Sequence, residues 1–62
     1  MLNKQYLYKG SHPYIKGKVG KVIVIIENSI FVEFLYGEEI YRVSTENLYD
    51  PYTGLRSDHS VS

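Results

Sequence analysis

The sequence contains no cysteine and no tryptophan, and its formal net charge is zero. Without cysteine, a chain of 62 residues has no disulfide framework and no thiolate for catalysis or metal binding, so a small apolar core must hold it. The longest apolar run, residues 22–26, is far shorter than the roughly 20 residues that span a membrane, and the N-terminus lacks a signal-peptide segment. We therefore expect one soluble, cytoplasmic domain without membrane contact.

The zero net charge conceals an uneven distribution. No acidic residue precedes position 22, whereas every acidic residue follows it, accompanied by only two basic side chains, Arg42 and Arg56. The chain is therefore polarised, and the basic segment of one copy could meet the acidic segment of another, so self-association is an expected property. The lysines that make the first third basic are Lys4, Lys9, Lys16, Lys18 and Lys21.

Two runs of β-branched and aromatic residues predict an antiparallel hairpin. Residues 22–26 and 30–36 have the composition of strands, and the polar break between them contains Asn28, which tolerates the left-handed conformation of a tight turn. A second turn at Gly37 leads into residues 40–43, where apolar and polar residues alternate. The three segments form a predicted meander.

Shorter elements flank the meander. Residues 5–8 read as a strand, the following residues 9–13 as a loop, and Gly17 and Gly20 as positions where a strand bends at the corner of a small barrel. Further along, residues 44–48 predict one helical turn.

The C-terminal region is expected to form the last strand of the fold and then a flexible tail. A short closing strand is predicted at residues 49–53, where an edge position would tolerate Pro51. Residues 54–62 are polar and turn-rich, which predicts a flexible tail. The expected fold is all-β: a five-stranded barrel over residues 1–53, with a long first loop and one short 3-10 turn before the last strand.

One segment resembles a known family. Residues 16–23 (KGKVGKVI), followed after a polar turn by residues 30–33 (IFVE), resemble the KOW-type motif of ribosomal and transcription-elongation SH3-like barrels. The resemblance, from Lys16 to Glu33, implies an SH3-like barrel and contacts with RNA or RNA polymerase through its loops. The Gly-Asp-x-Val start often found in such domains is absent, and the second half of the chain is acidic.

Catalytic and metal-binding patterns are lacking. His12 lies in the first loop and His59 in the expected tail, so a shared metal or acid-base role would need the chain to fold back. Residues 57–60 (SDHS) contain the residue types of a nucleophilic triad, but sequence neighbours cannot adopt its geometry. Glu38 and Glu39 would point to opposite faces of a strand. We expect no enzymatic activity, no cofactor and no metal.

Tyrosine and lysine provide the candidates for binding. Tyrosine offers a large apolar area with a polar tip and suits interfaces, and lysines interleaved with tyrosines suit nucleic acid. One hypothesis is a protein-binding accessory or inhibitory module, of mobile-element origin, that docks on a larger assembly. The alternative is an RNA- or DNA-binding module using residues 4–21. The candidate contact residues are Tyr8, Tyr14, Tyr49, Tyr52, Lys9, Lys16, Lys18 and Lys21.

Overall fold

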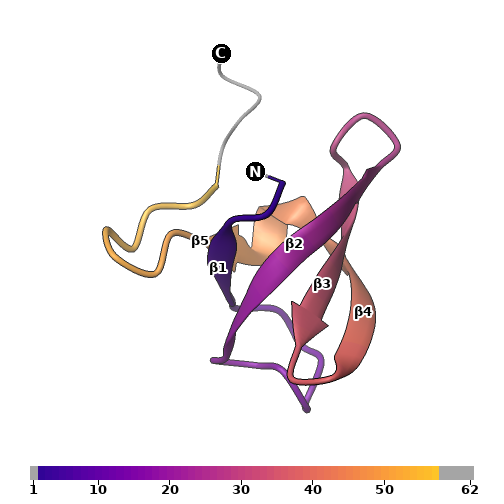
Figure 1. The fold of residues 1–62 in the computed structure, drawn as a ribbon. Coiled ribbons are helices and arrows are strands. Elements are labelled where there is room, and N and C mark those ends of the chain that lie inside the picture. The colour runs from indigo at the N-terminus through magenta and orange to yellow at the C-terminus, as the bar shows by residue number, and fades with distance from the viewer. Residues whose placement is uncertain (1, 58–62) are drawn as a thin grey trace.

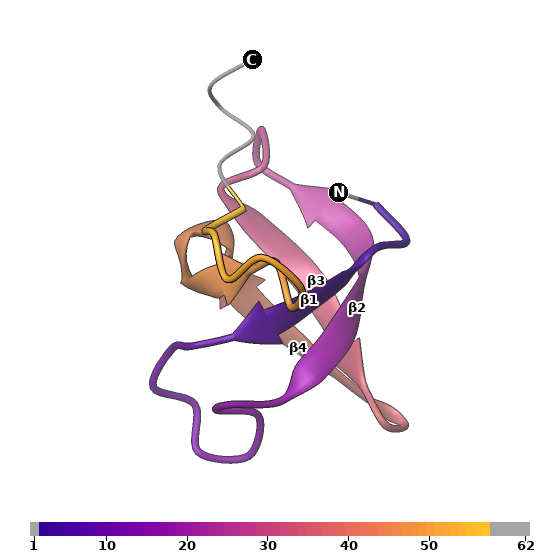
Figure 2. The same cartoon turned by 90° about the vertical axis from the view of Figure 1, so that its left-hand side faces the viewer.

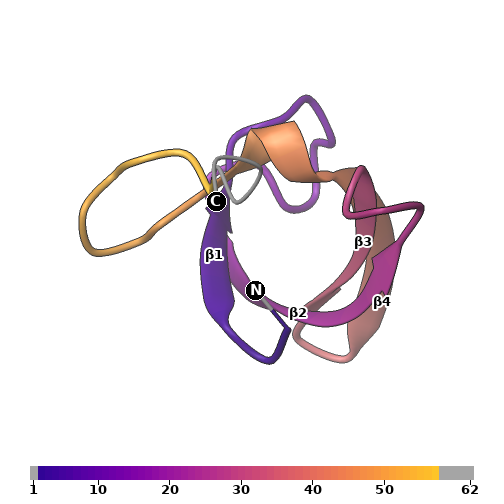
Figure 3. The same cartoon turned by 90° about the horizontal axis from the view of Figure 1, so that it is seen from above.

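The chain forms a single curled antiparallel sheet in a computed structural model that describes residues 2–57. Within these residues five strands are arranged in the order β4-β3-β2-β1-β5, and the view from above shows them curving into a half-barrel (Figures 1 and 3). The predicted all-β class, with a 3-10 turn before the last strand, is confirmed. The elements are β1 (Gln5–Tyr8), β2 (Val19–Ile26), β3 (Phe31–Tyr36), β4 (Glu39–Ser44), the 3-10 turn η1 (Thr45–Asn47) and β5 (Leu48–Tyr49).

The predicted hairpin is the β2–β3 pair, with a β-bulge between Val22 and Val24. Its turn is more unusual than the single left-handed position expected at Asn28. Glu27, Asn28 and Ser29 all have positive φ, at 52°, 57° and 73°. Side chains other than glycine rarely adopt this conformation because their Cβ crowds the backbone. The turn therefore needs support from elsewhere in the fold.

Thr45 supplies that support. Its hydroxyl donates to the carbonyl oxygens of Ser29 and Ile30, at 2.7 and 3.2 Å, and its backbone N–H donates to Ile30 at 3.0 Å. Thr45 is the one buried polar residue among those described, so these bonds also satisfy a hydroxyl that lies away from water. The 3-10 turn is thereby fastened to the tip of the β2–β3 hairpin.

Gly20 allows β2 and β3 to approach closely. A Cβ at this position would lie 2.5 Å from the carbonyl oxygen of Leu35 and 2.7 Å from the ring of Phe34. Real Cβ contacts are not this short, so only glycine fits without a shift of β3 or the ring. The predicted bend is therefore a packing requirement at Gly20. At Gly17 an added Cβ would have no atom within 4 Å, and the backbone φ of +78° is what favours glycine there.

The core is made of buried side chains from all five strands and from one loop residue. Phe34 lies at its centre, fully buried, with its ring centroid 6.0 Å from that of Tyr8. Ile15 is also fully buried, although it belongs to the first loop, residues 9–18, which returns to β2 beneath the sheet (Figure 2). The core residues are Tyr8, Ile15, Val22, Val32, Phe34, Val43 and Leu48.

The end of the chain differs from the expected closing strand over residues 49–53. β5 contains only Leu48 and Tyr49, and residues 50–54 form a turn, because Pro51 has no N–H and the Asp50 side chain binds the amides that follow. The first residues of the expected tail then return to β5: Ser57 donates its N–H to Leu48 at 2.9 Å. The tail prediction for residues 58–62 lies outside the described residues.

Candidate binding site

The tyrosines predicted to contact a partner are placed in different environments. Tyr8 is in the core and 5% exposed, whereas Tyr14 is 74% exposed in the first loop. Tyr49 is half-buried beneath Lys9, whose Nζ lies 4.7 Å from the ring centroid. Tyr52 is 88% exposed and lines a surface pocket that the other three tyrosines do not reach. The structure therefore brings only Tyr52 of the four to this pocket.

The predicted lysines are all exposed, but they belong to two different elements. Lys9, Lys16 and Lys18 belong to the first loop, whereas Lys21 lies on β2. Lys21 is paired across the sheet with Gln5, so both point to the convex outer face. Three of the four lysines therefore share one loop, and the fourth lies on the sheet.

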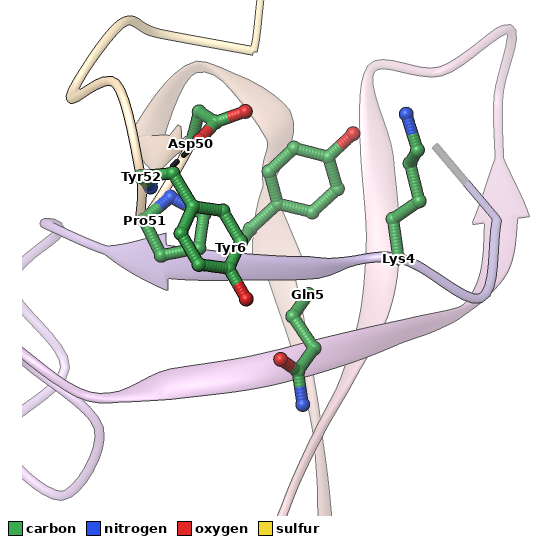
Figure 4. Close-up of a pocket in the computed structure, with 6 residues that line it drawn as sticks. All are labelled: Lys4, Gln5, Tyr6, Asp50, Pro51 and Tyr52. Carbon is green, nitrogen blue, oxygen red and sulfur yellow. Dashed lines mark hydrogen bonds between the residues drawn. The ribbon is translucent and has the colours of Figure 1, made fainter.

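The pocket opens between β1 and the turn that follows β5, and has a volume of about 310 Å³. We call it the Tyr6–Tyr52 pocket. In Figure 4, Lys4 and Tyr6 rise from the same side of β1 while Gln5 points to the other side, as alternation along a strand requires. Its lining residues, from two segments far apart in the sequence, are Lys4, Gln5, Tyr6, Asp50, Pro51 and Tyr52.

The wall formed by the turn is built around Asp50. Its Oδ1 accepts the backbone N–H of Tyr52 at 2.7 Å and of Thr53 at 3.0 Å, and its carbonyl accepts the N–H of Gly54 at 2.8 Å. Its own N–H donates to the carbonyl of Leu55 at 2.7 Å. An aspartate that binds the amides following it is a standard way to stabilise a turn. Asp50 therefore both shapes the pocket and presents a carboxylate to it.

The hydrogen bonds of the turn also set the electrostatics of the pocket. The backbone N–H groups of Thr53 and Tyr52 hold the pKa of the Asp50 carboxyl below its usual value, and the Lys4 ammonium acts in the same direction. Burial raises the pKa of the Tyr6 phenol above its usual value, and the negative charge of Asp50 raises it further. At neutral pH the pocket thus contains a carboxylate beside a neutral phenol.

This arrangement is suited to holding a side chain of a partner. The Tyr52 and Tyr6 rings and the Pro51 ring offer apolar surface, the Asp50 carboxylate accepts hydrogen bonds from a cation, and Lys4 can meet an anion at the opposite rim. A cationic side chain could lay its apolar stem against the rings with its charged end at Asp50.

The sequence does not predict most of this pocket. It places Lys4 and Tyr6 in a basic, tyrosine-containing segment and predicts a strand at Asp50 and Pro51. The run Asp50-Pro51-Tyr52-Thr53-Gly54 contains a usable signal, because aspartate and proline before glycine predict a turn. No local pattern, however, indicates that this turn faces β1.

A second aromatic cluster lies in the first loop. The His12 ring lies edge-on to Tyr41 of β4 with ring centroids 4.9 Å apart, and its centroid is 5.8 Å from that of Tyr14. The backbone N–H of Tyr14 also donates to His12 Nδ1 at 3.4 Å. Tyr14 is therefore held on His12 while most of its ring remains open to solvent, in the same loop as Lys16.

Comparisons with protein-family models, with curated proteins and with solved structures found no significant match for this chain. Among residues 2–57, no group of three or more histidine, aspartate or glutamate side chains is placed to hold a metal ion. Within the same range, no helix is long and apolar enough to cross a membrane.

Proposed function

We propose that this chain is an SH3-like barrel that acts as a non-enzymatic protein-binding module and docks on a larger assembly through the Tyr6–Tyr52 pocket. The observation that carries the proposal is the pocket's composition: the rings of Tyr6, Pro51 and Tyr52 line it together with a carboxylate that two backbone N–H groups hold in place. Aromatic grooves with a few fixed polar groups are typical of peptide recognition.

The size and charge of the pocket narrow the ligand. Its volume of about 310 Å³ is at the lower end of the range of roughly 300–1,000 Å³ for small-molecule sites. It therefore suits one or two side chains of a peptide segment. The partner segment we propose carries a lysine or arginine for Asp50, next to an apolar or aromatic residue for Tyr52.

A pull-down from a lysate of the native host tests this proposal. Tyr52→Ala removes the most exposed ring of the pocket, and Asp50→Asn removes its charge while keeping an oxygen for the turn. Tyr14→Ala is the matched control, because it truncates another exposed tyrosine outside the pocket. We expect a stoichiometric partner on the wild type and on the control that is lost from both pocket variants.

The proposal is wrong if no stoichiometric partner is retained, or if the two pocket variants retain it as well as the wild type does. Where a partner is found, peptides that tile it can be titrated into isotope-labelled protein. We expect chemical-shift changes in residues 4–6 and 50–52. Changes confined to the first loop would assign the contact to a different surface.

Nucleic-acid binding is the alternative, and the first loop supports it. Tyr14 presents its ring to solvent in the loop that also carries Lys9, Lys16 and Lys18. An exposed ring can stack on a base while neighbouring lysines neutralise phosphates. The KOW-like segment from Lys16 to Glu33 begins in this loop.

Mobility-shift assays against single- and double-stranded RNA and DNA at two salt concentrations separate the two functions. If the alternative holds, complexes form at low salt, weaken at higher salt, and are lost with Tyr14→Ala but retained with Tyr52→Ala. Absence of any complex at low salt would exclude it. The same two variants thus give opposite results under the two functions.

A further inference from the structure

β4 is an outer strand of the sheet and its outer edge is open. It has six residues, whereas the other outer strand, β5, has two and makes a further bridge to Arg56. β4 lies at the right of the sheet in Figure 1, below the tip of the β2–β3 hairpin. Such an edge presents unpaired N–H and C=O groups that another strand can bind.

The turn before β4 fixes which peptide groups are unpaired. Gly37 has a φ of 63° at the first of two central positions, where a type II′ hairpin takes glycine. A two-residue turn of this kind closes on a hydrogen-bonded pair, here Tyr36 and Glu39. Because the pattern alternates, Ile40 and Arg42 direct their N–H and C=O groups away from β3. Among the described residues, no further backbone bond reaches them.

β4 has only part of the usual protection of an edge strand. Natural edges are kept from pairing by charged side chains, especially lysine, and by proline, a bulge or an inward-pointing charge; β4 carries the charges of Glu39 and Arg42 but no lysine or proline. β4 reads Glu-Ile-Tyr-Arg-Val-Ser, and the bulge of this sheet lies between β2 and β3. Ile40 is 56% exposed on the outer face, beside Leu35 of β3.

We propose that β4 pairs antiparallel with β4 of a second copy of this chain, with the two Ile40 residues opposite each other. The register follows from charge. Pairing centred on Arg42 would set two arginines against each other, and pairing centred on Tyr41 would set Arg42 against an isoleucine. Centring on Ile40 places each Arg42, which faces Glu33 across its own sheet, opposite Glu38 in the turn before β4 of the other copy.

This register also extends an apolar row. Leu35 and Ile40 are cross-strand neighbours on the outer face, so the dimer continues the row through the second Ile40 to the second Leu35. The interface is one strand pair wide, which predicts weak association, with a dissociation constant of roughly micromolar or above. The Tyr6–Tyr52 pocket lies beside β1 at the other side of the sheet, so the dimer leaves both pockets open.

Sedimentation velocity from low-micromolar to near-millimolar protein measures the association. Ile40→Lys places a charge at the centre of the pairing, and we expect at least about a tenfold weaker association. Leu55→Lys is the matched control, because it changes another exposed apolar residue, outside β4, and should leave the association unchanged. Circular dichroism checks that both variants keep the wild-type fold.

A charge exchange tests the register itself. Arg42→Glu sets two acids opposite each other and should weaken the dimer, and adding Glu38→Arg should restore it with the net charge of the wild type. At high protein concentration the amide protons of Ile40 and Arg42 should also become protected from exchange with solvent. The proposal is overturned if the protein stays monomeric throughout, if Arg42→Glu has no effect, or if the double variant fails to recover.

Discussion

The centre of the sheet and the turn after β5 are held together by different means. At the centre, Phe34 and Val22 are fully buried, and a glycine brings the strands into contact. In the turn, Tyr52 and Leu55 are largely exposed, and hydrogen bonds to one residue, Asp50, fix the shape. Burial stabilises the whole fold, whereas a turn fixed by hydrogen bonds can leave its side chains available to a partner. The two regions should therefore respond differently to the same kind of substitution.

Truncation of an aromatic residue should give the largest contrast. Phe34→Ala removes a fully buried ring and is expected to cost about 3–5 kcal/mol. A core this small supplies no more than roughly that amount, so we expect the variant to be unfolded without denaturant. Tyr52→Ala removes an exposed ring and should change the free energy of unfolding by less than about 0.5 kcal/mol. Circular dichroism without denaturant tests whether Phe34→Ala is folded, and urea unfolding measures the free-energy change of Tyr52→Ala. If the two variants lose stability equally, the two regions do not differ in this way.

Glycine substitutions should show the next largest contrast. Gly20→Ala adds a Cβ against the Leu35 carbonyl and the Phe34 ring, and we expect it to cost about 1–3 kcal/mol, with Gly20→Val costing more. Gly54 has a φ of +79° but meets no atom within 4 Å, so Gly54→Asn should be nearly neutral, because asparagine tolerates this conformation. The urea midpoints of the Gly20→Ala and Gly54→Asn variants are compared with that of the wild type. The first reports the effect of crowding and the second the effect of the left-handed backbone conformation. A neutral Gly20→Ala would mean that β2 and β3 can move apart.

The hydroxyl of Thr45 should have an intermediate effect. Thr45→Val keeps the shape of the side chain and the backbone bond to Ile30 but loses the hydroxyl bonds to Ser29 and Ile30. The strained hairpin tip is then less supported, which should cost about 1–3 kcal/mol. Thr45→Ser keeps the hydroxyl and should recover part of the loss. Thermal unfolding of the two variants measures the difference. If serine is no better than valine, the methyl group and not the hydroxyl carries the contribution of Thr45.

The sequence predicts those parts of the fold that depend on neighbours along the chain. The β1 bounds, the β2–β3 hairpin and the 3-10 turn follow from β-branched runs, alternation and turn residues, all of which act over a few positions. Ile15 escaped prediction because a single apolar residue among polar loop residues has no periodicity, although the return of its loop to β1 buries it completely.

The candidate site depends on contacts that sequence patterns do not carry. The pocket joins Lys4 and Tyr6 to a turn more than forty positions later, and only the pairing of β1 with β5 brings them together. Tyr8 is a predicted contact residue because tyrosine favours interfaces, yet its position on the inner face of β1 places it against Phe34. Which tyrosines are available to a partner is therefore decided by strand register.

The smallest expected effect concerns the pocket alone and appears at alkaline pH. The folded protein holds the Tyr6 proton more tightly than the unfolded chain does, because burial and then the charge of Asp50 raise the pKa of the phenol. The resulting stability is complete below the ordinary tyrosine pKa of about 10 and is lost as the pH rises from there through the higher folded value. Tyr6→Phe removes this loss, and Asp50→Asn should reduce it by lowering the Tyr6 pKa. Lysines titrate in the same range, so the measurement is the difference in urea midpoint between wild type and variant across this window. If this difference does not change with pH, the Tyr6 phenol has the same pKa in the folded and in the unfolded protein. Burial in the pocket then does not raise the pKa of the phenol.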